Sequence, residues 1–251
     1  MPATQRAEDA PTAVLGRVGV LLDAFNGASS LTLAEITRRS GLPRSSSHRL
    51  LEQLVQLGWV SRVGNHYALG MRICELGTLV LHHNAVRRSA TPYLQELHRV
   101  SGLAVHLGLL DGEDVIYLDR VGGASSFRLP TRIGGRFPAH ASAIGKMLLA
   151  SSGLSGVPER LRPVTTHTIT RPAALMRALD RIRAERFSVE SSEGVLGISC
   201  VAVAVSSPDG TPTALSVAGP TDTIRPERLV PMLRATAQRI SHQLDQPRAA
   251  R

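Results

Sequence analysis

The segment from Leu31 to Leu69 constrains the fold more strongly than any other part of this sequence. Apolar residues at helical spacing predict a short helix that ends before Gly41 and a longer helix over residues 44–57. Gly41 supplies the permissive backbone that a tight turn between two helices needs. We place Pro43 in the first turn of the longer helix, where its missing N–H is not required. The pattern therefore predicts two helices that meet at a short turn.

A short hairpin follows these helices. Residues 59–63 and 66–69 read as two strands, and Gly64 and Asn65 between them form a turn pair. The order helix, turn, helix, hairpin is that of a winged helix-turn-helix, whose second helix enters the major groove of DNA. The alternative is an ordinary helical hairpin with a solvated basic face, and the uninterrupted order of the four parts argues against it.

The charge of this segment suits a polyanion. No acidic residue occurs between Ile36 and Leu51, whereas arginine occurs four times there. Small hydroxyl side chains at the start of the longer helix allow a close approach to DNA and donate to phosphates. From the longer helix we expect duplex contacts by Arg44, Ser45, Ser46, His48 and Arg49. From the hairpin we expect phosphate or minor-groove contacts by Arg62 and His66.

Composition agrees with an anionic partner but does not prove one. The 251 residues carry a formal net charge of +9 and are 43% hydrophobic, enough apolar residues for proper cores. The two cysteines, Cys74 and Cys200, form no disulfide framework, and the histidines have no metal-ligand spacing. No apolar run is long enough to span a bilayer. We therefore expect a cytoplasmic protein with no metal, no cofactor and no membrane partner.

The sequence divides into four predicted parts. Residues 1–11 look like a disordered lead-in, 12–71 the winged helix-turn-helix, 72–88 a linker helix, and 89–251 a second domain. The linker helix has an apolar side that we expect to pair with its copy in a dimer, because one reading helix covers too few base pairs for specificity.

The second domain alternates hairpins with helices, which predicts an antiparallel sheet with helices packed on it, an α+β fold. The predicted helices cover residues 91–100, 140–150, 171–186 and 226–244. The predicted strands cover residues 103–110, 114–121, 127–129, 187–191, 198–206 and 213–218.

Several blocks of the chain resemble the IclR family of bacterial transcriptional regulators. In the first part they are GLPRS at 41–45, HRLL at 48–51 and GWV at 58–60. In the second they are VIYLD at 115–119, PAHASAIGK at 138–146, GISCVA at 197–202 and LSVAGP at 215–220. The resemblance implies a winged helix-turn-helix, a linker helix and a GAF-like effector-binding domain. It also implies dimers or tetramers on a palindromic operator in double-stranded DNA, with a small organic ligand that alters this binding.

The resemblance further implies a ligand pocket between the sheet and the helix that carries AHASAIGK. The residues at the matching positions are Ser126, Leu129, Phe137, Ala143, Ile144, Glu190, Ile198, Cys200, Ser216 and Ala218. Ala218 stands where some relatives have a second hydroxyl, and Phe137 and Ile144 stand where smaller residues occur. We add Ser142, because the helix that starts near Ala141 presents free N–H groups beside the pocket. We expect a small organic acid, with its carboxylate at this helix end and an aromatic ring against Phe137.

The competing function is a metabolic enzyme or a ligand-storage protein with an incidental basic hairpin. Cys200 lies mid-strand among apolar residues, where a thiol is usually inert packing, and nothing in the sequence places His140 beside it. The glycine pairs fit neither a Walker nor a dinucleotide pattern. We therefore expect no catalysis. A duplex shift that is lost when Arg49 is changed separates the two functions.

Overall fold

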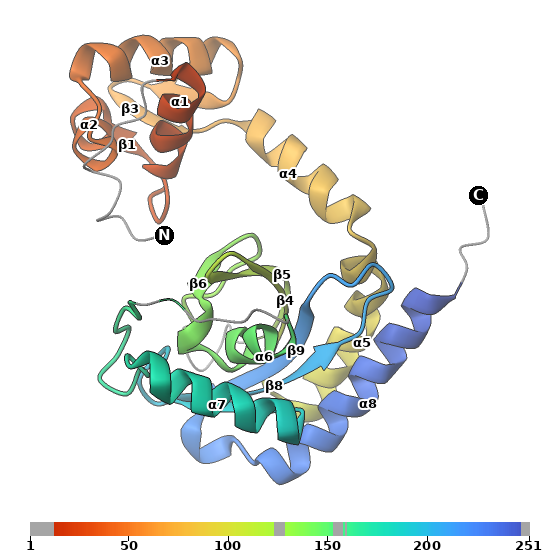
Figure 1. The fold of residues 1–251 in the computed structure, drawn as a ribbon. Helices are drawn as coiled ribbons and strands as arrows, with labels where there is room; N and C mark the ends of the chain where they lie inside the picture. Colours follow the sequence, from red (N-terminus) through yellow and green to blue (C-terminus); the bar gives the residue numbers. More distant parts are fainter. Residues whose placement is uncertain (1–12, 123–128, 153–157, 159, 247–251) are drawn as a thin grey trace. The chain divides into compact units, whose positions relative to one another are not determined.

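The computed structural model describes residues 13–122, 129–152, 158 and 160–246. The chain divides into two compact units, Met1–His83 and Asn84–Arg251, and each is described by itself (Figure 1). The predicted lead-in at 1–11, Ser126 and most of the predicted strand at 127–129 lie outside the described residues.

The first unit is a winged helix-turn-helix, as the sequence predicts. Its elements are α1 (Val14–Asp23), β1 (Leu31–Thr32), α2 (Leu33–Ser40), α3 (Arg44–Gln56), β2 (Val60–Val63), β3 (His66–Leu69) and α4 (Met71–His83). The strands form a three-stranded antiparallel sheet in the order β1-β3-β2. Leu21, Ile36 and Leu51 are fully buried where α1, α2 and α3 meet. The sequence reasoning did not assign α1 and β1.

Local chemistry explains where α2 and α3 begin and end. The Thr32 hydroxyl accepts from the Glu35 N–H, and the Glu35 carboxylate accepts from the Thr32 N–H, which is a capping box. Gly41 ends α2 with φ of +69°, a left-handed conformation that glycine adopts without strain. Pro43 is the N-cap of α3 rather than a residue of its first turn, because helical dihedrals start at Arg44.

The predicted linker helix over 72–88 is two helices in the structure. α4 ends at His83, and α5 (Ala85–Ser101) begins after Asn84, whose side chain caps it by accepting from the Arg87 N–H at 2.8 Å. Pro92 lies inside α5, so the prediction that a helix starts at residue 91 was wrong. The helix tolerates the missing N–H of Pro92, and the neighbouring Thr91 hydroxyl donates to the Arg87 carbonyl oxygen at 2.8 Å.

The second unit is a six-stranded antiparallel sheet with helices on both faces, and it confirms the α+β prediction (Figure 1). The strands are β4 (Ala104–Asp111), β5 (Asp114–Val121), β6 (Arg136–Pro138), β7 (Ser188–Ser191), β8 (Ile198–Val205) and β9 (Thr213–Pro220), in the order β6-β5-β4-β9-β8-β7. The helices after α5 are α6 (Ala143–Ser151), α7 (Pro172–Glu185) and α8 (Pro226–Asp245). Short 3-10 turns cover Ala139–Ala141 and Thr221–Thr223. β6 is a further strand that the sequence analysis did not assign.

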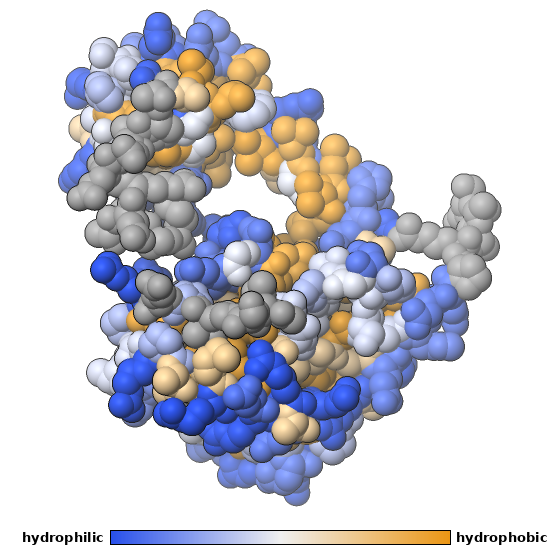
Figure 2. Space-filling model, in the orientation of Figure 1, coloured by the Kyte–Doolittle hydropathy of each residue, from blue (hydrophilic) through white to orange (hydrophobic). Residues whose placement is uncertain are grey.

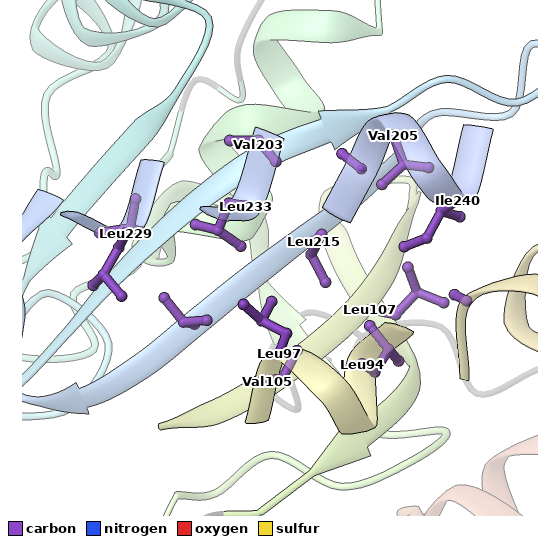
Figure 3. Close-up of a cluster of buried hydrophobic side chains, with 14 of the residues drawn as sticks. Leu94, Leu97, Val105, Leu107, Val203, Val205, Leu215, Leu229, Leu233 and Ile240 are labelled. Carbon is purple, nitrogen blue, oxygen red and sulfur yellow. The ribbon is translucent and has the colours of Figure 1, made fainter. Parts of the chain in front are cut away.

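Alternation along the strands divides the sheet into two cores. Side chains such as Val203, Leu215 and Leu107 face α5 and α8 and pack against Leu94 and Leu233 (Figure 3). The opposite face packs against α6 and α7 through small residues such as Ala202 and Ala214. The smaller side chains on this second face leave room between the sheet and α6.

Candidate nucleic-acid interface and ligand cavity

The outer side of α3 carries the side chains predicted to contact DNA. Arg44, Ser45, His48 and Arg49 are exposed, and Ser46 is half-buried. The opposite side of the helix is anchored in the core of the first unit by the buried side chains of Ser47, Leu50, Leu51 and Leu54. The helix therefore presents its polar side to solvent on a rigid support.

The N-terminus of α3 is open to an anion. Pro43 at the N-cap has no side-chain acceptor, so no cap bonds the first N–H groups of α3. Those N–H groups and the positive end of the helix dipole lie beside the exposed Arg44 and Ser45. A phosphate placed there receives both backbone and side-chain donors.

The β2–β3 hairpin, which we call the wing, is tied to α3 through an acid. The Glu52 carboxylate lies 3.2 Å from an Arg62 terminal nitrogen and 3.5 Å from the His48 ring. Arg62 also donates to the Gly64 carbonyl oxygen at 3.1 Å and lies over the Tyr67 ring. Glu52 thus contacts two predicted DNA-binding residues, Arg62 and His48, on the surface. His66, the other predicted wing contact, is exposed at the start of β3.

One arginine of this segment also has a structural role. Arg39 is exposed and donates to the Ala24 carbonyl oxygen at 3.0 Å, at the C-terminal end of α1. This bond satisfies a carbonyl group at a helix end within the first unit.

In the second unit, one cavity lies between the sheet and the start of α6, and we call it the α6 cavity. All the predicted pocket residues that the structure describes line it: Leu129, Phe137, Ser142, Ala143, Ile144, Glu190, Ile198, Cys200, Ser216 and Ala218. Ser126 lies outside the described residues. Sequence reasoning missed further lining residues: His106, Tyr117, Pro130, Thr131, Ala141, Gly194 and Val195. His106 pairs with Ser216 across β4 and β9 and faces the same way, a register that the sequence alone does not give.

The α6 cavity is small. Its volume is about 40 Å³. Small-molecule sites usually span about 300–1,000 Å³. A ligand with a ring therefore enters only if lining side chains move.

The start of α6 gives the cavity a polar end. The Ser142 hydroxyl caps α6 by accepting from the Gly145 N–H at 3.1 Å. The approach of the chain is so close here that a Cβ at position 145 would lie 2.2 Å from the Ala139 carbonyl oxygen. Gly145 therefore lets the Ala139–Ala141 turn pack directly on the first turn of α6, which fixes the direction of its N–H groups.

A neutral histidine forms another polar part of the lining. His106 is buried, and its Nε2 lies 3.0 Å from the Thr131 hydroxyl. Burial, with a smaller contribution from the Arg120 charge, lowers the pKa of His106 to about 3. The adjacent Tyr117 ring lies 5.3 Å from the imidazole, and burial raises the pKa of its hydroxyl. Both groups are therefore uncharged hydrogen-bonding partners near neutral pH.

Glu190 and Cys200 face each other from paired positions on β7 and β8. Burial raises the pKa of the Glu190 carboxyl, although this carboxyl accepts from the Glu193 N–H at 2.9 Å. Burial and then the Glu190 charge raise the pKa of the Cys200 thiol. The thiol is therefore held in its protonated form, which is a poor nucleophile.

A buried ion pair supports this side of the cavity. Lys146 of α6 lies 2.5 Å from the Glu193 carboxylate, and both residues are at least nine-tenths buried. The Thr168 hydroxyl donates to the Glu193 carbonyl oxygen at 2.7 Å. The pair joins α6 to the turn after β7 and so positions two segments that line the cavity.

Other chemistry finds little support among the described residues. His140 is engaged by the Arg162 carbonyl oxygen, which lies 2.9 Å from its Nε2. Across the described ranges, His, Cys, Asp and Glu side chains form no group that fits a metal ion. Among the helices that the structure describes, none has the length and apolar character needed to cross a membrane.

A DNA-reading unit joined to a unit with an internal cavity defines a ligand-responsive transcriptional regulator. Comparison with known proteins gives the family: residues 14–64 match the IclR helix-turn-helix domain, and residues 78–242 match the bacterial transcriptional regulator IclR C-terminal domain. The chain belongs to the IclR family of transcriptional regulators.

Curated relatives agree along most of the chain. The chain is 32% identical over 247 residues to the HTH-type transcriptional regulator KdgR of Escherichia coli (strain K12), covering 94% of each protein. It is 35% identical to the regulator XynR of the same organism, over 74% of this chain and 77% of XynR. A solved IclR homolog from Microbacterium hydrocarbonoxydans, crystallised with 4-hydroxybenzoate, is 29% identical, with a TM-score of 0.80 over 92% of this chain and 99% of its own.

Proposed function

We propose that this regulator binds an inverted-repeat operator as a dimer or tetramer, and that a small organic acid in the α6 cavity alters this binding. The exposed, uncapped start of α3 beside Arg44 and Arg49 is the observation that carries the DNA-binding assignment. In this proposal Arg44, Ser45, Ser46, His48 and Arg49 contact the duplex from α3, and Arg62 and His66 contact it from the wing. DNA binding requires Arg62 and His48 to exchange Glu52 for phosphate.

Arg49→Ala tests the DNA contacts. A close base or phosphate contact predicts a loss of about 1–3 kcal/mol in operator binding. The matched control is Arg177→Ala, which removes the same charge from an exposed position on α7. Fluorescence anisotropy with an operator duplex measures both. Equal affinity of the folded Arg49→Ala protein and the parent would reject the assignment.

The proposed assembly uses α4. None of its residues is buried, and its apolar side chains Met71, Leu79 and Val80 are exposed by 72%, 52% and 69%. Figure 2 shows hydrophobic residues gathered on the surface over this helix. An apolar helix side of this kind favours contact with a second copy. A monomer in light scattering that retains full operator affinity would contradict this part of the proposal.

The proposed ligand is a small organic acid, and an aromatic ring suits the apolar walls. Phe137, Ile144 and Ile198 supply the walls, and Ser142 with the first N–H groups of α6 supplies donors to a carboxylate. Burial raises the pKa of the Glu190 carboxyl, which is the acidic group of this lining. His106, Tyr117 and Ser216 offer additional partners to a hydroxyl elsewhere on the ligand. The 4-hydroxybenzoate held by the solved relative has both groups, which supports this class.

A thermal-shift series tests the ligand class. Benzoate, 4-hydroxybenzoate and aliphatic acids are each paired with the matching neutral amide, and we expect only acids to stabilise the second unit. Ser216→Leu places a larger side chain in the cavity and should remove the shift. Amides that stabilise as well as acids, or an unchanged response in Ser216→Leu, would overturn the proposed binding mode.

We also propose that the chain has no catalytic activity and acts in the cytoplasm, where its operator lies. The protonated Cys200 thiol and the engagement of His140 with Arg162 support this proposal. The curated relatives are regulators, so the alternative of an enzyme or storage protein is not favoured.

A further inference from the structure

β5 departs from a regular ladder beside the α6 cavity. Leu107 of β4 pairs with Asp119, whereas the next residue, Gly108, pairs with Tyr117, so Leu118 is an extra residue in β5. Such a bulge re-aims the side chains around it. Tyr117 lines the α6 cavity, whereas Leu118 packs in the core under α5 and α8. The bulge therefore has one side at the cavity and the other at α5.

On the α5 side, the bulge is fastened to the first turns of the helix. Arg87 Nε donates to the Leu118 carbonyl oxygen at 3.1 Å and lies 3.3 Å from the Asp119 carboxylate. The Thr91 hydroxyl lies 3.1 Å from the same carboxylate oxygen and shares its proton between this oxygen and the Arg87 carbonyl oxygen. The Arg87 N–H in turn donates to Asn84, the single residue between α4 and α5. These contacts hold the N-terminal end of α5 against the bulge in β5.

On the cavity side, Arg120 of β5 connects Asp119 to the cavity lining. The Arg120 N–H donates to the other oxygen of the Asp119 carboxylate at 2.9 Å. The Arg120 guanidinium donates to the Thr131 carbonyl oxygen at 2.6 Å, and the Thr131 hydroxyl is the partner of His106. Arg120 also pairs with His106 across β5 and β4. A continuous set of hydrogen bonds therefore runs from the cavity lining to the start of α5.

These bonds resist being broken singly. Asp119 is only 5% exposed, and a buried carboxylate that loses a donor costs more than an exposed one. The Arg87–Asp119 ion pair at 3.3 Å adds a charge–charge attraction to these hydrogen bonds. A shift of Thr131 is therefore expected to move Arg120, Asp119 and Arg87 together. Because the cavity is small and Thr131 lines it, we expect entry of a ring to displace Thr131.

We propose that Arg87, Asp119 and Arg120 are positioning residues that couple occupancy of the α6 cavity to the start of α5. Only Asn84 separates α5 from α4, so a movement of the start of α5 is passed along the backbone to α4. The inference rests on the proposed function, in which the cavity holds the effector.

The test is hydrogen exchange at residues 85–91 in the full chain. Thr131→Val removes the hydroxyl at the cavity, and we expect it to speed exchange at 85–91 by about fivefold or more, the range of ordinary coupling energies. Thr131→Ser retains the hydroxyl and should exchange like the parent. In an Arg87→Gln background, the effect of Thr131→Val should disappear. Arg99→Gln, which changes an exposed arginine of the same helix, serves as the matched background and should leave the effect intact.

Unchanged exchange at 85–91 in Thr131→Val, or the same change with and without Arg87, would overturn the coupling. This cycle needs no ligand. A second arm adds 4-hydroxybenzoate to the parent chain and records the thermal shift. A missing shift with an intact cycle would reject the ligand class and leave the coupling in place, so the two failures are distinguishable.

Discussion

His106 makes the stability of the second unit depend on pH. Its pKa is about 3 in the folded chain and 6.5 in its ordinary state, so the folded protein excludes a proton that the unfolded chain binds. A lowered pKa gives stability that is present above pH 6.5 and is lost as the pH falls from 6.5 toward 3. Between pH 7.5 and 5.5, one such histidine predicts a loss of about 1.4 kcal/mol in the free energy of unfolding. His106→Gln retains a hydrogen-bonding side chain without this titration, so the pH difference should shrink by that amount.

The two units allow an internal control. Hydrogen exchange of the β4 and β9 amides, corrected for intrinsic rates, reports on opening of the second unit at both pH values. Trp59, the single tryptophan of the chain, lies in the first unit, so its fluorescence during urea unfolding follows the other unit. His106→Gln should leave the tryptophan transition unchanged. If the parent and His106→Gln lost the same free energy between pH 7.5 and 5.5, the neutral buried histidine would be refuted.

Three further perturbations follow from the geometry. Gly145→Ala places a Cβ 2.2 Å from the Ala139 carbonyl oxygen and should destabilise the second unit by about 1–3 kcal/mol or more. Gly77→Ala, which has open space around it, should cause no such loss. Urea unfolding measures both variants. Lys146→Met leaves Glu193 buried without its cation and should lower the free energy of unfolding by about 3–5 kcal/mol in the same assay. Adding Glu193→Gln should recover most of this loss. No recovery would contradict the pairing. Leu79→Glu places a charge on the exposed apolar side of α4 and should shift the mass from light scattering toward that of a monomer. Thr78→Glu on the same helix should leave the mass unchanged. Equal masses for Leu79→Glu and the parent would reject α4 as the interface.

Much of the first unit was predictable because its signals are local. Gly41 ends α2 with a positive φ, and the Gly64–Asn65 pair forms the turn of the wing. The boundaries of these elements are therefore set by residues next to them in the sequence. The break at Asn84 was not predictable from periodicity, because apolar residues continue across it from α4 into α5. Only the cap that Asn84 provides to the Arg87 N–H decides that the helix stops there.

The cavity shows the same division between local and non-local information. The resemblance to the IclR family brought together lining residues from distant segments, such as Phe137 and Ser216. It did not bring in His106 or Tyr117, because their position depends on the register of β4 against β9 and on the bulge in β5. Register and bulges follow from contacts across the sheet, which single-sequence patterns do not contain.

The central claim is that a ligand in the α6 cavity changes the affinity of α3 and the wing for DNA. The most direct measurement is the dissociation constant of the full chain for its operator duplex, with and without saturating acid that the thermal-shift series has shown to bind. The account predicts a change of about fivefold or more. It also predicts that Ser216→Leu abolishes this change while retaining operator binding. An acid that binds in the cavity and leaves the operator dissociation constant unchanged would contradict the claim.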